Sequence, residues 1–372
     1  MQIRIQTVAD PKSLTRFLRF PWRIQATDPN WVPPLLFDQR NLLSPKHPFH
    51  KHAHVEHFLA VDENGEVRGR ISAIANRAHN EFWHDSVGFY GFFESENNQS
   101  VANALFDAAA ASLKAQGLDT MRGPMNFSTN EECGLLVDGF DTPPAVMMTH
   151  NPPFYADLHE AAGFVKAKDL LAYQMHIGEL TDRVRNIGKK LEERMDFKFR
   201  LFNTKDFKGE VERFKVIYNS AWEENWGFVP MTDEEIDVMA ESLKMVLDPR
   251  LIQFAETSDG KTVGFILALP DLNVIFKKLN GKLFPFGIIR VLLNKRKTHR
   301  ARVLAMGVLP EYRKKGIDTV LYMRAYEIGT AAGYHWGEFS WVLEDNELMN
   351  SAARSMGSTA YKTWRIYDRK IT

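Results

Sequence analysis

A hairpin pattern occurs twice in this chain, and this repeat constrains the fold more than any other feature. Residues 57–74 (HFLAVDENGEVRGRISAI) and 252–269 (IQFAETSDGKTVGFILAL) each indicate a half-apolar strand, a turn at Asn-Gly or Asp-Gly, and a second strand. At a fixed offset of 195 residues the two stretches share five of 18 positions, and two of these five are glycines. A period of about half the chain is too long for a solenoid, so the repeat predicts two tandem domains.

The order of elements in the second half predicts a mixed sheet with helices. Apolar periodicity indicates the order β-α-α-β-β-β-α-β-α-β, and a similar but less regular order is expected in the first half. The fold class is therefore expected to be α/β (α+β), with two tandem mixed-sheet domains. We place these domains at residues 1–179 and 196–372. The charged segment 180–195 (LTDRVRNIGKKLEERM) has a helical period and is expected to be the connector between the two domains.

Composition excludes several classes of protein. Lys plus Arg (47) balance Asp plus Glu (47), so no global field recruits DNA, and any phosphate-binding surface must be local. The single cysteine, Cys133, rules out an internal disulfide framework and a multi-cysteine zinc site. We expect no metal, because the histidines of residues 46–57 lack a carboxylate or cysteine spacing that completes a site. No run of 18 apolar residues occurs, and a cytoplasmic protein is expected.

The stretch from Val308 (VLPEYRKKGIDTVLYMRA) carries the strongest indication of chemistry. A buried strand is expected to end at Pro310, followed by a basic loop and a helix that begins near Ile317. Consecutive backbone N–H groups and a helix N-terminus then point at one spot, which suits a pyrophosphate. The side chains of Arg313, Lys314 and Lys315 add cationic donors. The alternative interpretation is an ordinary strand-to-helix turn with solvated charges.

This stretch resembles a known family signature. Val308, Pro310, Arg313 and Gly316 match the V-x-P-x-x-(Q/R)-x-x-G-x-(G/A) pattern of the GCN5-related N-acetyltransferase (GNAT) superfamily. Asn346 begins a second block, and Gly357 follows at that family's spacing. The match covers about residues 197–369, and the first half looks like a diverged copy. The whole chain therefore resembles a tandem GNAT protein.

The resemblance implies a donor, an acceptor and a set of site residues. The cosubstrate would be acetyl-CoA or another acyl-CoA, and the acceptor a small-molecule or peptide amine. The pyrophosphate would bind the amides of residues 313–318, and the pantetheine would lie along the strand 301–309, with the Val308 N–H as the oxyanion donor. The expected cofactor-binding residues are Met306, Val308, Arg313, Lys314, Lys315, Gly316, Ile317, Asp318 and Asn346.

Two positions depart from the family pattern, and the residue that acts as general base is not decided by it. Asp318 stands where Gly or Ala is usual; we expect it to cap the following helix rather than face the pyrophosphate. Ala353 stands where many members carry a tyrosine that protonates the leaving thiolate. Glu338, in the strand next to the reactive one, and Glu344, at its end, are the candidate bases, with helix capping as the alternative role.

The first copy lacks the basic loop. It supplies Glu94 and Glu96 where the second copy supplies Arg and Lys, so it is expected to shape an acceptor pocket rather than bind a second CoA. Its long loop, residues 122–155, is rich in Gly, Pro and Asn, which favours a functional segment. Cys133 in this loop is expected to be a structural thiol.

A basic and apolar insertion interrupts the second copy at residues 272–300. It contains five Lys and three Arg against no acidic residue, interleaved with Phe, Ile and Leu. Four interpretations fit: a lid over an acyl chain, a contact with an anionic membrane or another acidic partner, a dimer surface, or a solvated basic face packed on its own domain.

Together these features predict an acyl-CoA-dependent N-acyltransferase, with an acetyl group as the first expectation and the donor bound by the C-terminal domain. Transfer from an acyl carrier protein or an aminoacyl-tRNA is an alternative, and the basic insertion could contact such an acidic partner. A catalytically silent ligand-binding protein is a third interpretation, because of Asp318 and Ala353.

Overall fold

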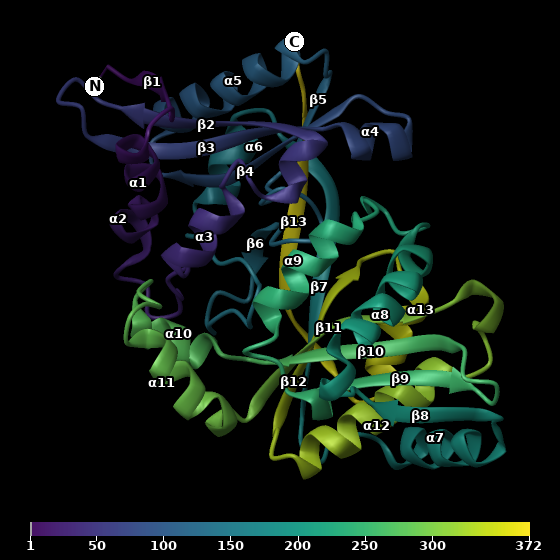
Figure 1. The fold of residues 1–372 in the computed structure, drawn as a ribbon. Helices are drawn as coiled ribbons and strands as arrows, with labels where there is room; N and C mark the ends of the chain where they lie inside the picture. The colour runs from purple at the N-terminus through teal and green to yellow at the C-terminus, as the bar shows by residue number, and fades with distance from the viewer. Residues whose placement is uncertain (1) are drawn as a thin grey trace. The chain divides into compact units, whose positions relative to one another are not determined.

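The chain forms two compact units in a computed structural model that describes residues 2–372 (Figure 1). Unit 1 comprises residues 2–170, 276–288 and 362–372, and unit 2 comprises residues 171–275 and 289–361. Both units combine a mixed sheet with helices, so the expected α/β (α+β) class is confirmed. None of the helices among the described residues is both long enough and apolar enough to span a bilayer.

Unit 1 has a sheet of order β1-β2-β3-β4-β5-β13. The pairs β1–β2, β2–β3 and β3–β4 are antiparallel, β4–β5 is parallel, and β5–β13 is antiparallel. Its strands are β1 (Arg4–Thr7), β2 (Ala53–Val61), β3 (Val67–Asn76), β4 (Val87–Ser95), β5 (Thr120–Gly123), β6 (Leu135–Asp138), which pairs with β13, and part of β13 (Thr359–Lys370). Its helices are α1 (Pro11–Arg19), α2 (Pro21–Gln25), α3 (Leu36–Leu42), η1 (Pro48–Lys51), α4 (Arg77–Trp83), α5 (Gln99–Ala115) and α6 (Tyr155–Ala161).

Unit 2 repeats this arrangement with the sheet order β8-β9-β10-β11-β12-β7. Its strands are β7 (Val165–His176, in part), β8 (Phe197–Leu201), β9 (Ile252–Thr257), β10 (Thr262–Pro270), β11 (Arg300–Val308) and β12 (Trp336–Leu343). Its helices are α7 (Asp182–Arg194), α8 (Phe207–Trp222), α9 (Asp233–Leu243), α12 (Ile317–Ala331) and α13 (Glu347–Ser355), with short turns η2 (Thr204–Asp206), η3 (Pro249–Leu251), η4 (Lys295–Lys297) and η5 (Pro310–Tyr312). Helices α10 (Asn273–Leu279) and α11 (Gly287–Asn294) lie in the insertion between β10 and β11.

The pairing register confirms the internal duplication. Ala60 pairs with Gly69 in the β2–β3 hairpin, and Ala255 pairs with Gly264 in the β9–β10 hairpin, which is the same pair shifted by 195 residues. Each hairpin is followed by an antiparallel strand and then a parallel one. The two hairpins therefore occupy the same place in two copies of one topology.

The last strand of each sheet comes from the other half of the chain. The C-terminal part of β13 completes unit 1, where Tyr367 pairs with Gly123. The C-terminal part of β7 belongs to unit 2, where β7 is the neighbour of β12. The compact units are thus discontinuous in sequence, unlike the contiguous domains 1–179 and 196–372 expected above. Segment 180–195 does contain the expected charged helix, and this helix α7 packs on α12, where a Cβ on Gly188 would lie 2.6 Å from the Met323 sulfur.

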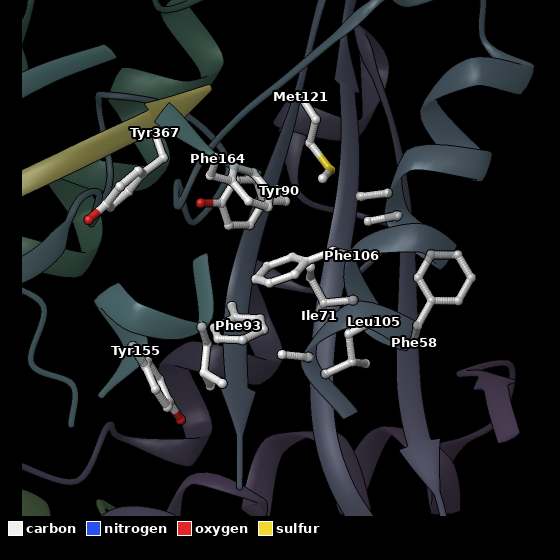
Figure 2. Packing of buried hydrophobic residues seen from close by; sticks show 14 of the residues in the cluster. Phe58, Ile71, Tyr90, Phe93, Leu105, Phe106, Met121, Tyr155, Phe164 and Tyr367 are labelled. Atoms are coloured by element: carbon white, nitrogen blue, oxygen red, sulfur yellow. The ribbon is translucent and has the colours of Figure 1, made fainter. Parts of the chain in front are cut away.

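Aromatic packing fills the core of unit 1. Figure 2 shows Phe93 and Phe106 facing each other, and their rings stack with centroids 4.7 Å apart. Phe93 lies on β4 and Phe106 on α5, so this contact fixes the helix on the sheet. In unit 2, α12 and α8 both pack on β10 and β11, and the core includes Ile217, Phe265 and Leu321. These helices hold β11 in place on both faces.

Candidate functional site

Strands β11 and β12 of unit 2 separate after their first residues. Their parallel ladder runs from Arg300 opposite Trp336 to Val303 opposite Phe339 and does not extend beyond that pair. The register between β10 and β11 shifts at the same level, because Leu267 pairs with Ala305 and Ala268 with Val303, which leaves Leu304 as an extra residue. A bulge of this kind bends and twists its strand. The C-terminal half of β11 therefore borders a gap in the sheet.

The N–H of Val308 faces this gap. Residues of an antiparallel pair point their N–H groups alternately toward and away from the partner strand. Leu309 donates its N–H to the carbonyl of Val263 on β10 at 2.9 Å, so the preceding N–H, that of Val308, points away from β10. By the same alternation the N–H of Met306 points away from β10. Both residues expected to line a pantetheine thus lie on the gap side of β11.

The turn after β11 leads into a helix that has no side-chain cap. Lys314 and Gly316 both have positive φ angles, +62° and +83°, and Gly316 is the N-cap residue of α12. Gly316 has no side chain that could cap the first N–H groups of α12, among them those of Ile317 and Asp318. A glycine is required at position 316 for two local reasons. Its φ is positive, and a Cβ there would lie 2.9 Å from the Leu191 side chain of α7. The arrangement leaves a helix N-terminus with its partial positive charge available.

The three basic side chains of this turn have different surroundings. Arg313 donates to the Ala221 carbonyl at 3.0 Å and to the Glu224 carboxylate at 3.3 Å, beyond the C-terminal end of α8. The Lys315 ammonium lies 4.6 Å from the centre of the Tyr312 ring, and Lys314 is exposed. In this structure Arg313 therefore fixes the turn to α8, whereas Lys314 and Lys315 remain solvent-exposed cations beside the helix start.

The expectation that Asp318 caps α12 is wrong. Asp318 is the second residue of the helix, Gly316 is the N-cap, and the cap carries no side-chain hydrogen bond. Asp318 is exposed in the first turn, where a carboxylate interacts favourably with the helix dipole. The negative charge of Asp318 would also repel an anionic ligand bound at the N-terminus of α12.

Asn346 has a structural role in this structure. It is the N-cap of α13, and its side chain accepts the N–H of Met349 at 3.1 Å. One turn later, the buried Asn350 donates to the carbonyls of Leu343 and Glu344 and accepts the hydroxyl of Tyr173 at 3.0 Å. Sequence reasoning missed Asn350, although a second Asn four residues after a cap, on the same helix face, was a usable indication.

Ala353, at the position of the family's tyrosine, is buried against Tyr173 and Val342. On α12, the Tyr322 hydroxyl donates to the Met349 sulfur at 3.7 Å. Burial raises the pKa of Tyr322 far above its usual range. That hydroxyl is therefore neutral at neutral pH.

Glu338 lies at the closed end of the gap, in the pair opposite Arg302. Its carboxylate is completely buried, accepts hydrogen bonds from the hydroxyls of Ser340 and Tyr361, and lies 3.6 Å from the Arg302 guanidinium. Burial raises the pKa of Glu338, and the charge of Arg302 opposes part of that effect. Tyr361 itself is only partly buried. Glu344 is partly exposed at the end of β12.

The equivalent gap in unit 1 is occupied by side chains of the protein. The β4–β5 ladder ends at Phe89 opposite Arg122, but the Phe92 N–H then bonds the Asn126 side chain at 2.8 Å. Ser95 corresponds to Val308, because each pairs with the repeated glycine, and its N–H bonds the Tyr155 hydroxyl at 2.9 Å. The segment that supplies both partners is the long loop 122–155.

The helix start of unit 1 is also closed to an anion. Asn98 caps α5 and accepts the N–H groups of Ser100 and Val101. Glu94 is buried next to Arg70, with 3.8 Å between the nearest charged atoms, and burial raises the pKa of Glu94. Glu96 forms ion pairs with Arg23 and Arg68. The register that matches Ser95 with Val308 places Glu94 at the position of Gly307 and Glu96 at that of Leu309, so the expectation that they stand where the second copy has its basic residues is wrong.

The remaining candidates have local roles. Cys133 is buried and forms a backbone bridge opposite Met125. Over residues 2–372 the structure has no cluster of three His, Cys, Asp or Glu side chains that could hold a metal ion. His52 bonds Asn76, whereas His54 is exposed on β2.

Comparisons with known proteins agree with this geometry. The model of the acetyltransferase (GNAT) family matches residues 211–357, which include the gap and the turn. A protein of Caulobacter vibrioides (strain NA1000 / CB15N), described as a bacterial ceramide synthase, is 37% identical over 98% of this chain and 96% of its own length. The chain belongs to the GNAT superfamily. It is a GNAT-type acyltransferase, and thus a transferase enzyme rather than a silent binding protein.

Further relatives support the tandem arrangement. Protein YghO of Escherichia coli (strain K12) is 36% identical over 99% of this chain and 95% of its own length. A tandem GNAT protein from the clavulanic acid biosynthesis pathway has the same fold over 100% of this chain and 99% of its own, with a TM-score of 0.60 at 12% identity. A GNAT protein from Sphaerobacter thermophilus covers 99% of this chain and 96% of its own, with a TM-score of 0.55 at 13% identity.

Proposed function

We propose that the protein transfers an acyl group from acyl-CoA, bound by unit 2, to the primary amino group of a long-chain amino alcohol. The product is an amide of the ceramide type. The observation that carries the donor side is the N–H of Val308, which faces a gap that leads to an uncapped helix start. The acceptor class is supported by the 37% identity, over nearly the whole chain, to a protein described as a ceramide synthase.

The donor fits the residues of unit 2. The N–H groups at the start of α12 and the exposed ammonium groups of Lys314 and Lys315 would bind the pyrophosphate. The pantetheine would extend along β11 past Met306, because the β11–β12 ladder does not close there. Unit 1 offers no equivalent site, since Tyr155, Asn126 and Asn98 already bind the corresponding N–H groups. One acyl-CoA per chain is therefore expected.

The reaction is a direct acyl transfer. The acceptor ammonium first gives one proton to a base, and the nitrogen lone pair then attacks the thioester carbonyl carbon. A C–N bond forms, and the Val308 N–H donates to the oxygen on which negative charge develops. The C–S bond breaks, and the thiolate takes the second proton that the nitrogen loses. Amide and free CoA are the products, and no further co-reactant is needed.

Glu338 is the base in this proposal, and Tyr361 is the relay. The Tyr361 hydroxyl donates to Glu338, so it can receive the amine proton while passing its own proton to the carboxylate. Burial and the nearby Glu338 charge raise the pKa of Tyr361, which keeps it neutral between transfers. Burial raises the pKa of Glu338 toward the range in which a base works well at neutral pH.

The test is an assay of the purified protein with acyl-CoA donors of graded chain length and a sphingoid base. Release of the CoA thiol and formation of the amide are measured together, the latter by mass spectrometry. Thiol release that requires the long-chain amine supports the proposal, and acetylated short amines should be poor products. Activity with acyl carrier protein or aminoacyl-tRNA as donor, but with no acyl-CoA, would contradict the proposed donor.

A further inference from the structure

The insertion between β10 and β11 presents an apolar surface to solvent. The link between β3 and β4 is residues 77–86, whereas the link between β10 and β11 is residues 271–299, of which 276–288 belong to unit 1. Helix α11 (Gly287–Asn294) lies within this added segment, followed directly by the turn η4 (Lys295–Lys297). The added length thus forms ordered structure in the part of the chain where the first copy has a short helix.

Helix α11 turns apolar residues outward. Val291 is only 1% exposed and marks the side that packs on the protein, whereas Ile289 is 52% exposed and Leu293 70% exposed. At 100° per residue, Ile289 and Leu293 lie within about 40° of each other, on the side opposite Val291. Phe286, immediately before the helix, is 78% exposed. A surface helix of a water-soluble domain has the reverse pattern, with polar residues outward.

The charged residues around this face have one sign. Arg290, Arg296 and Lys297 are exposed, and over residues 2–372 the structure gives none of them a carboxylate partner. Residues 272–300 contain eight basic and no acidic side chains. Lys295, by contrast, is partly buried and donates to the Met245 carbonyl, which ties η4 to unit 2. Exposed apolar side chains next to exposed cations in one segment are complementary to an anionic lipid surface.

We infer that α11 and η4 form a membrane-docking element that binds anionic phospholipid bilayers. Ile289 and Leu293 insert among the acyl chains, and Arg290, Arg296 and Lys297 contact the phosphates. Each buried apolar side chain and each cation contributes independently, so binding depends on both lipid charge and insertion. A second copy of the chain is less suited to this face, because two surfaces of the same positive charge would meet at a symmetric contact.

This inference goes beyond the proposed reaction and does not depend on it. A long-chain amine and a long-chain acyl-CoA both partition into bilayers, so a docking element in the link between β10 and β11 would bring the enzyme to its substrates. The test nevertheless uses neither substrate, and failure of one proposal therefore leaves the other standing.

The experiment is co-flotation of the full chain with lipid vesicles. One set of vesicles contains phosphatidylglycerol in phosphatidylcholine, and the other contains phosphatidylcholine alone. Wild type is expected to float with the anionic vesicles and to be released by high salt. The Ile289→Ser/Leu293→Ser variant should bind at least about tenfold more weakly, because it loses two inserted side chains. Replacing Arg290, Arg296 and Lys297 by Gln should weaken binding about fivefold per charge.

The matched control is Leu348→Ser, which removes an 83% exposed leucine from α13 without nearby clustered cations. Its flotation should equal that of wild type. Thermal melts establish that each variant is folded, and light scattering gives its mass. Absence of flotation by wild type, or equal flotation by the Ile289→Ser/Leu293→Ser variant, would overturn the inference. So would a wild-type dimer that this variant converts to a monomer without any change in vesicle binding.

Discussion

The Tyr155 hydroxyl accepts the N–H of Ser95 at 2.9 Å and donates to the Glu94 carboxylate at 2.7 Å. Ser95 occupies in the first copy the position of Val308 in the second. In unit 1 the Tyr155 side chain thus binds the N–H of Ser95. The corresponding N–H in unit 2, that of Val308, is the one that the proposed reaction needs. The two copies share a topology but differ in whether this N–H faces a protein hydroxyl or the gap.

Tyr155→Phe tests the role of this side chain. The variant leaves the Ser95 N–H without its hydrogen bond and removes one donor from the buried Glu94, which keeps the hydrogen bonds from Gln25, so we expect the free energy of unfolding to fall by about 1–3 kcal/mol. The affinity for CoA should stay unchanged, because the donor is assigned to unit 2. Urea denaturation and calorimetric titration measure the two quantities. Two CoA molecules per wild-type chain, or loss of CoA binding in Tyr155→Phe, would show that unit 1 binds the donor.

Val308→Pro tests the oxyanion donor with little disturbance of the sheet. The Val308 N–H points away from β10, so proline removes this donor without removing the ladder bond that Leu309 makes to Val263. The loss of one such donor is expected to lower kcat about 10²–10³-fold. Val308→Ala keeps the N–H and serves as the control, with kcat expected to stay near that of wild type. Equal losses in both variants would assign the effect to packing instead.

Glu338→Gln and Tyr361→Phe test the proton route. Burial raises the pKa of Glu338 above its usual value of 4.5, so the ionised base is lost as pH falls through that raised pKa. The wild-type kcat/KM should therefore fall on the acid side of its pH profile. In Glu338→Gln this limb should disappear together with about 10²–10⁴-fold of the rate. A variant that melts lower but keeps the wild-type pH profile would instead give Glu338 a positioning role beside Arg302.

Much of the fold follows from local patterns that the sequence displays openly. The glycines at 69 and 264 and the turns at 65 and 260 identify the repeated hairpins, and their registers agree residue by residue. A continuous apolar run also places β11, and the glycine at 316 marks the turn into α12. Such features depend on neighbours a few residues away, so a single sequence contains them.

Other features depend on contacts between distant segments and could not be read from periodicity. The strands β7 and β13 are similar, so periodicity alone does not tell which of them pairs with β5. In the structure β13 is the neighbour of β5. Tyr155 fills a position 60 residues away along the chain. Arg313 matched a family position, yet its guanidinium binds α8. Motif matching locates a backbone position well, but the direction of a long side chain is set by tertiary neighbours.

Asp318→Asn tests whether the carboxylate in the first turn of α12 opposes the donor. Its negative charge interacts favourably with the helix start, so the variant should lose about 0.3–1 kcal/mol of stability. The same charge repels a pyrophosphate at the uncapped N–H groups, so removing it should tighten CoA binding about two- to fivefold, and the gain should shrink in high salt. Thermal melts and calorimetric titration at two salt concentrations measure both effects.

The control for this variant is Glu347→Gln, which removes a carboxylate from the first turn of α13. It should lose comparable stability through the helix dipole, but its CoA affinity should not change, because α13 is not the helix assigned to the pyrophosphate. If Asp318→Asn lowers stability and leaves CoA affinity unchanged at low salt, the pyrophosphate does not lie at the start of α12. Lys314 and Lys315 would then have to bind it further out along the turn.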